Sequence, residues 1–81
     1  MNNLKAIYHK KSKVIELYEG DRLLKEEIVH EPEDWWFGAK IGRNEYDFNL
    51  FENKIGMYNC YKEKGHWKTG EFEGEVPVEI K

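Results

Sequence analysis

The chain has 81 residues, with 13 Lys and Arg against 16 Asp and Glu, and a formal net charge of −3 at pH 7. This length predicts one small domain over residues 1–81 and leaves no room for a separate cofactor domain or lid. The acidic balance disfavours nucleic-acid binding, because such binding depends chiefly on neutralising phosphates. It is compatible with a partner protein that presents a basic surface.

The single cysteine, Cys60, excludes an intramolecular disulfide and a cysteine-based zinc knuckle. The three histidines lie at no recognised metal spacing, so we expect neither a metal nor a cofactor. The beginning of the chain lacks the apolar core of a signal peptide, and no apolar run approaches membrane-spanning length. These features predict a cytoplasmic protein that does not contact a membrane.

The first twenty residues predict a β-hairpin. Apolar side chains mark strands over residues 4–8 and 14–18, and the lysine-rich stretch between them is typical of a turn. Gly20 and Asp21 then suit a tight two-residue turn of type I′ or II′.

Residues 22–30 fit two interpretations. As a strand they would pair with the preceding one and bring Lys25 opposite Glu16, which is a favourable cross-strand pair. As a helix they would begin with Asp21 as the N-cap. The neighbouring tight turns favour the strand.

The next segment is the least strand-like part of the chain. One helical turn is expected near residues 32–37, with Pro32 in its first turn. A bend at residues 42–44 precedes a strand with apolar side chains on one face over residues 46–50. The strand over residues 55–61 is apolar on both faces and is therefore expected in the middle of a sheet.

The last strand alternates acidic and apolar residues almost without interruption. The acidic series is Glu71, Glu73, Glu75 and Glu79, and the apolar series is Phe72, Val76, Val78 and Ile80. This period of two predicts a strand with one wet and one buried face. Pro77 cannot donate to a β-ladder, so the strand is expected at a sheet edge.

These elements together predict an all-β fold, or a β fold with one short helical turn. The expected architecture is a small antiparallel meander whose five or six strands form a curved sheet or barrel.

No pattern in the chain indicates an enzyme. The paired carboxylates of the last strand are typical of a solvated face, and Cys60 in a predicted central strand is typical of an inert, buried thiol. The glycines are scattered and form no phosphate-binding loop. We therefore expect a non-enzymatic protein.

The strongest candidate binding site is Trp35-Trp36-Phe37 with the preceding acids Glu33 and Asp34. Two adjacent strand residues point to opposite faces, so at least one tryptophan should reach the surface. Tryptophan is enriched at binding hot spots, and the acids would select a cationic partner. The alternative is that both rings fill the core, as large aromatic side chains in small domains commonly do.

A second candidate site combines Trp67 and His66 with Lys40 and Arg43. Aromatic rings beside cations are the pairing with which strand-based platforms stack bases. This pattern keeps an OB- or SH3-like binder of single-stranded nucleic acid as an alternative. A site for a small anionic ligand or nucleotide is a further alternative.

We expect the protein to bind another protein without catalysis. Its size and charge are typical of an inhibitor or adaptor of the phage or mobile-element type in bacteria, by analogy alone. An exposed tryptophan pair would also be compatible with a homodimer.

Overall fold

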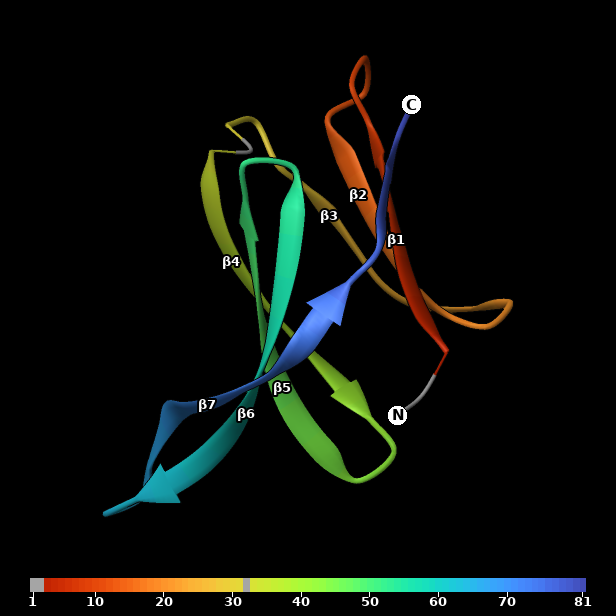
Figure 1. Ribbon diagram of the computed structural model, residues 1–81. Helices are drawn as coiled ribbons and strands as arrows, with labels where there is room; N and C mark the ends of the chain where they lie inside the picture. The colour runs from red at the N-terminus through yellow and green to blue at the C-terminus, as the bar shows by residue number, and fades with distance from the viewer. Residues whose placement is uncertain (1–2, 32) are drawn as a thin grey trace.

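The computed structural model describes residues 3–31 and 33–81, and within these ranges it contains eight β-strands and no helix (Figure 1). The strands are β1 (Leu4–His9), β2 (Val14–Glu19), β3 (Arg22–Ile28), β4 (Asp34–Ile41), β5 (Asn44–Phe51), β6 (Lys54–Glu63), β7 (His66–Val76) and β8 (Val78–Ile80). The all-β class and the curved antiparallel sheets are confirmed. The strands are divided between two sheets, and they are more numerous than the five or six expected.

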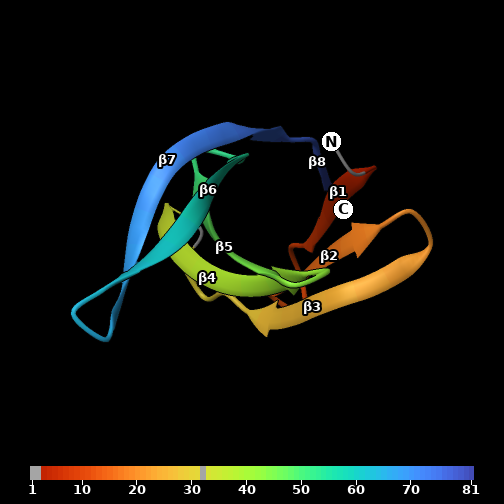
Figure 2. The same ribbon diagram turned by 90° about the horizontal axis from the view of Figure 1, so that it is seen from below.

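Each sheet has four strands. Sheet A has the order β3-β2-β1-β8, and sheet B has the order β4-β5-β6-β7. All neighbouring strands are antiparallel except β1 and β8, which are parallel. Figure 2 shows the two sheets curving around one interior, with the β7–β8 connection on one side and β3 near β4 on the other.

The interior between the sheets holds one hydrophobic core. The largest fully buried side chains are Phe48, Ile15, Leu17, Leu50, Ile55 and Val29. The Tyr8 hydroxyl donates a buried hydrogen bond of 2.9 Å to the carbonyl of Val29. Since the core uses only the inner faces, the outer face of each sheet is left to the solvent or a partner.

The predicted helical turn near residues 32–37 is wrong, because β4 begins at Asp34. Along this strand Phe37, Ala39 and Ile41 are buried, while Trp36 and the other alternate residues are exposed. A period of two is what a strand at the surface of a core requires. Pro32, expected in the first helical turn, lies outside the described residues.

Residues 22–28 form β3, so the preferred strand interpretation is confirmed for that range. The predicted pairing of Glu16 with Lys25 is wrong. Glu16 lies opposite Glu26, and Leu17 lies opposite Lys25, because the register shifts by one residue at a bulge. The extra residue is Leu24, which packs against the core and is thereby removed from the ladder.

The last predicted strand is divided by Pro77 into β7, at the edge of sheet B, and β8, at the edge of sheet A. The predicted edge position is therefore confirmed, and the Pro77 carbonyl accepts a hydrogen bond of 2.9 Å from the Ala6 N–H. Phe72 departs from the predicted buried series because its side chain is 57% exposed. The register of β6 and β7 shifts at Tyr58, which turns Phe72 outward.

Candidate functional site

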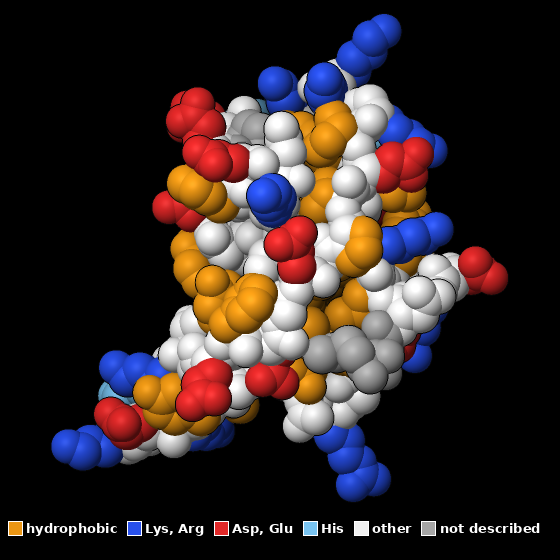
Figure 3. Space-filling model, in the orientation of Figure 1, with side chains coloured by type: hydrophobic (Ala, Val, Ile, Leu, Met, Phe, Trp, Pro, Cys, Tyr) orange, Lys and Arg blue, Asp and Glu red, His pale blue; other side chains and the backbone are white. Residues whose placement is uncertain are grey.

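The outer face of sheet B carries three neighbouring aromatic side chains. Trp36 of β4 lies 5.3 Å from Tyr58 of β6, measured between ring centroids, and Tyr58 lies 5.5 Å from Phe72 of β7. We call these three residues the aromatic row. Figure 3 shows hydrophobic side chains emerging over the strands of sheet B and along the arm formed by the far ends of β6 and β7.

The row is open to solvent although its rings touch. Trp36 is 49% exposed and Phe72 is 57% exposed, while Tyr58 between them is half-buried. Gly56 makes the room for these contacts. A Cβ atom on Gly56 would lie 3.2 Å from the Tyr58 ring and 3.3 Å from the Phe72 ring. The glycine therefore lets both rings lie down over the backbone of β6.

Carboxylates lie next to the row. Asp47 is directly opposite Tyr58 across β5 and β6, and Glu75 is opposite Gly56 across β6 and β7. Asp34 precedes Trp36 by two positions and so shares its face; its carboxylate accepts a hydrogen bond of 2.8 Å from the Asn49 amide. The apolar rings therefore have an acidic border.

The first predicted site, residues 33–37, is divided between the two faces of β4. Trp36 and Asp34 lie on the outer face, and Glu33 is exposed in the turn before the strand. Trp35 is half-buried against the core, and its Nε1 donates a hydrogen bond of 3.2 Å to Glu27. Phe37 is buried, so its role is in the core and it is not part of the surface.

The second predicted site is only partly assembled. Arg43 and Trp67 line one hollow of about 290 Å³. Lys40 lies opposite Glu45 on the neighbouring strand, and His66 lies opposite an acidic residue at the tip of the arm. The cationic side chains thus alternate with acids and form no continuous basic track.

The Trp67 ring already has a cation beside it. The Lys62 ammonium lies 5.2 Å from the ring centroid, on the adjacent strand of the arm. This cation–π contact within the arm shows that the exposed indole is partly engaged by the chain itself.

Cys60 lies near the same hollow, beside Asp47 on the outer face. Burial of the thiol, followed by the charge and hydrogen bonding of Asp47, raises the pKa of Cys60 to about 11. The Thr69 hydroxyl donates a hydrogen bond of 2.6 Å to the same carboxylate. The thiol therefore stays protonated at neutral pH and is a poor nucleophile.

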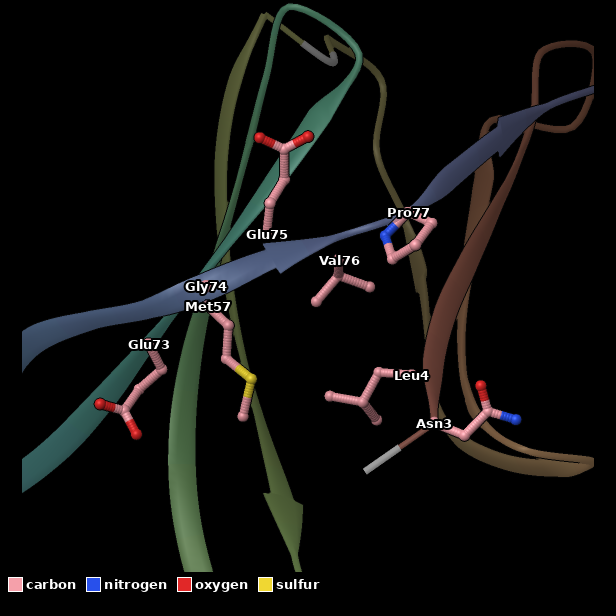
Figure 4. Close-up of a pocket in the computed structure, with 8 residues that line it drawn as sticks. All are labelled: Asn3, Leu4, Met57, Glu73, Gly74, Glu75, Val76 and Pro77. Carbon is pink, nitrogen blue, oxygen red and sulfur yellow. The ribbon is translucent and has the colours of Figure 1, made fainter. Parts of the chain in front are cut away.

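A pocket of about 300 Å³ lies between β7 and the beginning of β1 (Figure 4). Its lining comprises Asn3, Leu4, Met57, Glu73, Gly74, Glu75, Val76 and Pro77. The side chains of Leu4, Met57 and Val76 point into the gap, while the Glu73 and Glu75 carboxylates point away from it on opposite sides of β7 (Figure 4). The described lining contains no Lys, Arg or His.

Sequence reasoning did not bring Tyr58 of β6 and Phe72 of β7 together with Trp36. The alternation in residues 55–61 does indicate that Tyr58 faces away from Met57, which is buried. Phe72 gave no such signal, because the strict period of two placed it with the buried residues. The pocket depends on a contact between β7 and β1, which no local pattern could indicate.

Residues 3–31 and 33–81 contain no group of three or more His, Cys, Asp or Glu side chains placed to hold a metal ion. The same part of the chain has no helix of the length and apolarity needed to cross a membrane. Comparison with known proteins found no family model, no curated protein and no solved structure that matches this chain.

Proposed function

We propose that the protein binds another protein, without catalysis, through the outer face of sheet B. The observation that carries this proposal is the aromatic row, a set of touching rings whose two outer members are about half exposed. A large aromatic group surrounded by polar residues is the usual composition of a binding hot spot. Trp36 at one end of the row is its main anchor.

The border of the row defines the expected partner. Asp34, Asp47 and Glu75 surround the rings, which favours a partner with a basic surface around an apolar centre. A small acidic binder of this kind suits the role of an inhibitor or adaptor that covers a functional surface of its target. The raised pKa of Cys60 also disfavours thiol-based catalysis.

The proposal is tested by affinity capture from a bacterial lysate with the folded protein as bait. We expect one stoichiometric protein partner for the wild type and its loss for the Trp36→Ala/Phe72→Ala variant. The matched control is Tyr61→Ala, because Tyr61 is 46% exposed but lines a different hollow of the arm. If Tyr61→Ala loses the partner as completely as Trp36→Ala/Phe72→Ala does, or if the double variant still captures the partner, the proposed surface is contradicted.

Single-stranded nucleic acid remains the second candidate, because Arg43 and Trp67 line the same hollow. It predicts capture of nuclease-sensitive material that is released by moderate salt. The Arg43→Ala and Trp67→Ala variants would weaken that binding, whereas the aromatic-row variant would leave it intact.

A further inference from the structure

We infer that the free edge of β7 and the pocket beside it take an extended, lysine- or arginine-rich segment of a partner protein by strand addition. This inference adds the mode of binding and a second contact region. It rests on the proposed function only in that the partner is a protein, since it does not require the aromatic row.

The first argument is the open edge of sheet B. β7 pairs with β6 along one side, and within the described residues no strand pairs with β7 on its other side. The pairing with β1 begins only where the Ala6 N–H meets the Pro77 carbonyl. An edge strand turns alternate N–H and C=O groups outward, which is the template for an added strand.

The second argument is the pocket beside this edge. Gly74 lies opposite buried Met57, and a Cβ atom placed on it would meet no atom within 4 Å. With φ of +144° this position also favours glycine. Because no side chain fills the space, Leu4, Met57 and Val76 are left as apolar walls (Figure 4). An aliphatic side chain from an added strand would complete this corner of the core.

The third argument is the charge of the edge. Glu71, Glu73 and Glu75 are all exposed on β7, and residues 69–80 include no Lys, Arg or His. A second copy of β7 would bring like charges together, so this strand disfavours self-pairing through the same edge. A basic segment would place opposite charges across the new ladder. The charge therefore favours a partner other than a second copy.

The fourth argument is continuity with the aromatic row. An added strand next to β7 would extend sheet B, and its outward side chains would lie beside Phe72. The strand edge and the outer face would then form one continuous surface. A single partner could use both.

The test uses three synthetic peptides titrated into the full-length, ¹⁵N-labelled chain. The probe is acetyl-Lys-Leu-Lys-Leu-Lys-amide, whose alternation offers aliphatic groups to the pocket and cations to the carboxylates. The second peptide replaces every lysine with glutamate. The third keeps the probe's side chains but carries N-methyl groups on both leucines, which removes main-chain donors.

For the lysine probe we expect amide shifts and slower hydrogen exchange centred on residues 72–76. N-methylation should weaken binding by about tenfold, because the two leucine N–H groups can no longer donate to the ladder. The glutamate peptide should not bind. Equal binding of all three peptides, shifts confined to other strands, or no shift at millimolar probe would overturn the inference.

A charge variant supplies the control within the protein. Glu73→Gln/Glu75→Gln should weaken the lysine probe by about five- to tenfold, while Glu79→Gln on β8 should leave its affinity unchanged. The two proposals then fail separately. If Trp36→Ala/Phe72→Ala loses the captured partner but the lysine probe does not bind, the proposed function is retained and strand addition is overturned. If the probe binds at β7 but the same double variant still captures the partner, strand addition is retained and the proposed function of the aromatic row is overturned.

Discussion

At the scale of single residues, the core depends on a few large side chains such as Phe48. Phe48 is fully buried, and its ring stacks on Phe37 with 5.3 Å between centroids. Truncation to alanine should cost about 3–5 kcal/mol of unfolding free energy, because it removes apolar contacts and leaves a cavity. Urea denaturation followed by tryptophan fluorescence measures this loss. Phe51→Ala on the same strand is the control and should cost less than about 1 kcal/mol, since Phe51 is 50% exposed.

Cys60 gives a second residue-scale prediction. With a pKa raised from 9.0 to about 11, its thiolate fraction at pH 9 is about fifty times smaller than that of an ordinary cysteine. Its reaction with a disulfide reagent should be slower, but by less than about fifty-fold, because a thiolate of higher pKa is the stronger nucleophile. Asp47→Asn removes the carboxylate charge that contributes to the shift, so the pKa should fall and the rate should rise. Thiol reaction rates measured between pH 7 and 10 check this, and a slower reaction in Asp47→Asn would contradict it.

The adjacent tryptophans show how far residue patterns reach. The rule that neighbours on a strand face opposite ways predicted that one ring would be exposed, and the structure places Trp36 outside and Trp35 half inside. The rule could not tell which of the two rings is exposed, because a helical turn was expected near residues 32–37, where β4 begins. The contact of Trp35 with Glu27 was also out of reach, since it joins β4 to a different sheet.

At the scale of elements, the β6–β7 hairpin depends on one close contact. A Cβ atom on Gly70 would overlap the amide of Asn59, whose Oδ1 accepts a hydrogen bond of 3.0 Å from the Glu71 N–H. Gly70→Ala should therefore displace this amide and cost about 1–2 kcal/mol.

The double variant Asn59→Ala/Gly70→Ala separates the steric clash from the loss of glycine itself. The cost of Gly70→Ala should shrink by about 1 kcal/mol once Asn59 is truncated, a coupling typical of residues in contact. Urea denaturation of the four proteins in the cycle gives this coupling. If the free-energy costs of the two single substitutions simply add in the double variant, the two residues do not compete for the same space.

The sequence predicted most strands and the tight turn at Gly20, whose φ of +61° is the positive value that such a turn needs. It did not predict the bulges. One bulge at Leu24 changed the partners of Glu16, and the register shift at Tyr58 turned Phe72 to the outer face. A bulge depends on which side chain the core can accept, and that is decided by packing between sheets and not by local pattern.

At the scale of the whole molecule, sheets A and B are separate because β3 and β4, although consecutive in the chain, do not pair, and one long-range pairing then adds the end of the chain to sheet A. β1 pairs in parallel with β8, so residues 6–8 lie beside residues 78–80. No short-range pattern connects segments so far apart, which is why a single meander was expected. Pro77 stands at the point where the chain leaves one sheet for the other.

This pairing yields a prediction for the whole fold. Deletion of residues 78–81 removes β8 and both hydrogen bonds of Lys81, which join its N–H to Tyr8 and its carbonyl to Lys10. It also removes Val78 and Ile80, which pack against the core. The deletion should lower the free energy of unfolding by about 3 kcal/mol or more, which is a large part of the stability of a domain this small. The milder Ile80→Ala variant should lose only about 1–2 kcal/mol, because the β1–β8 ladder remains.

Urea denaturation distinguishes the contribution of the strand from that of the side chain. If the deletion costs no more than Ile80→Ala, β8 adds side-chain burial but its backbone ladder adds no stability. A larger loss, accompanied by faster hydrogen exchange along β1, would show that β8 protects the far edge of sheet A. Because β1 would then have open main-chain groups on that side, the deleted protein should also self-associate more readily than the full chain, as light scattering at rising concentration would reveal.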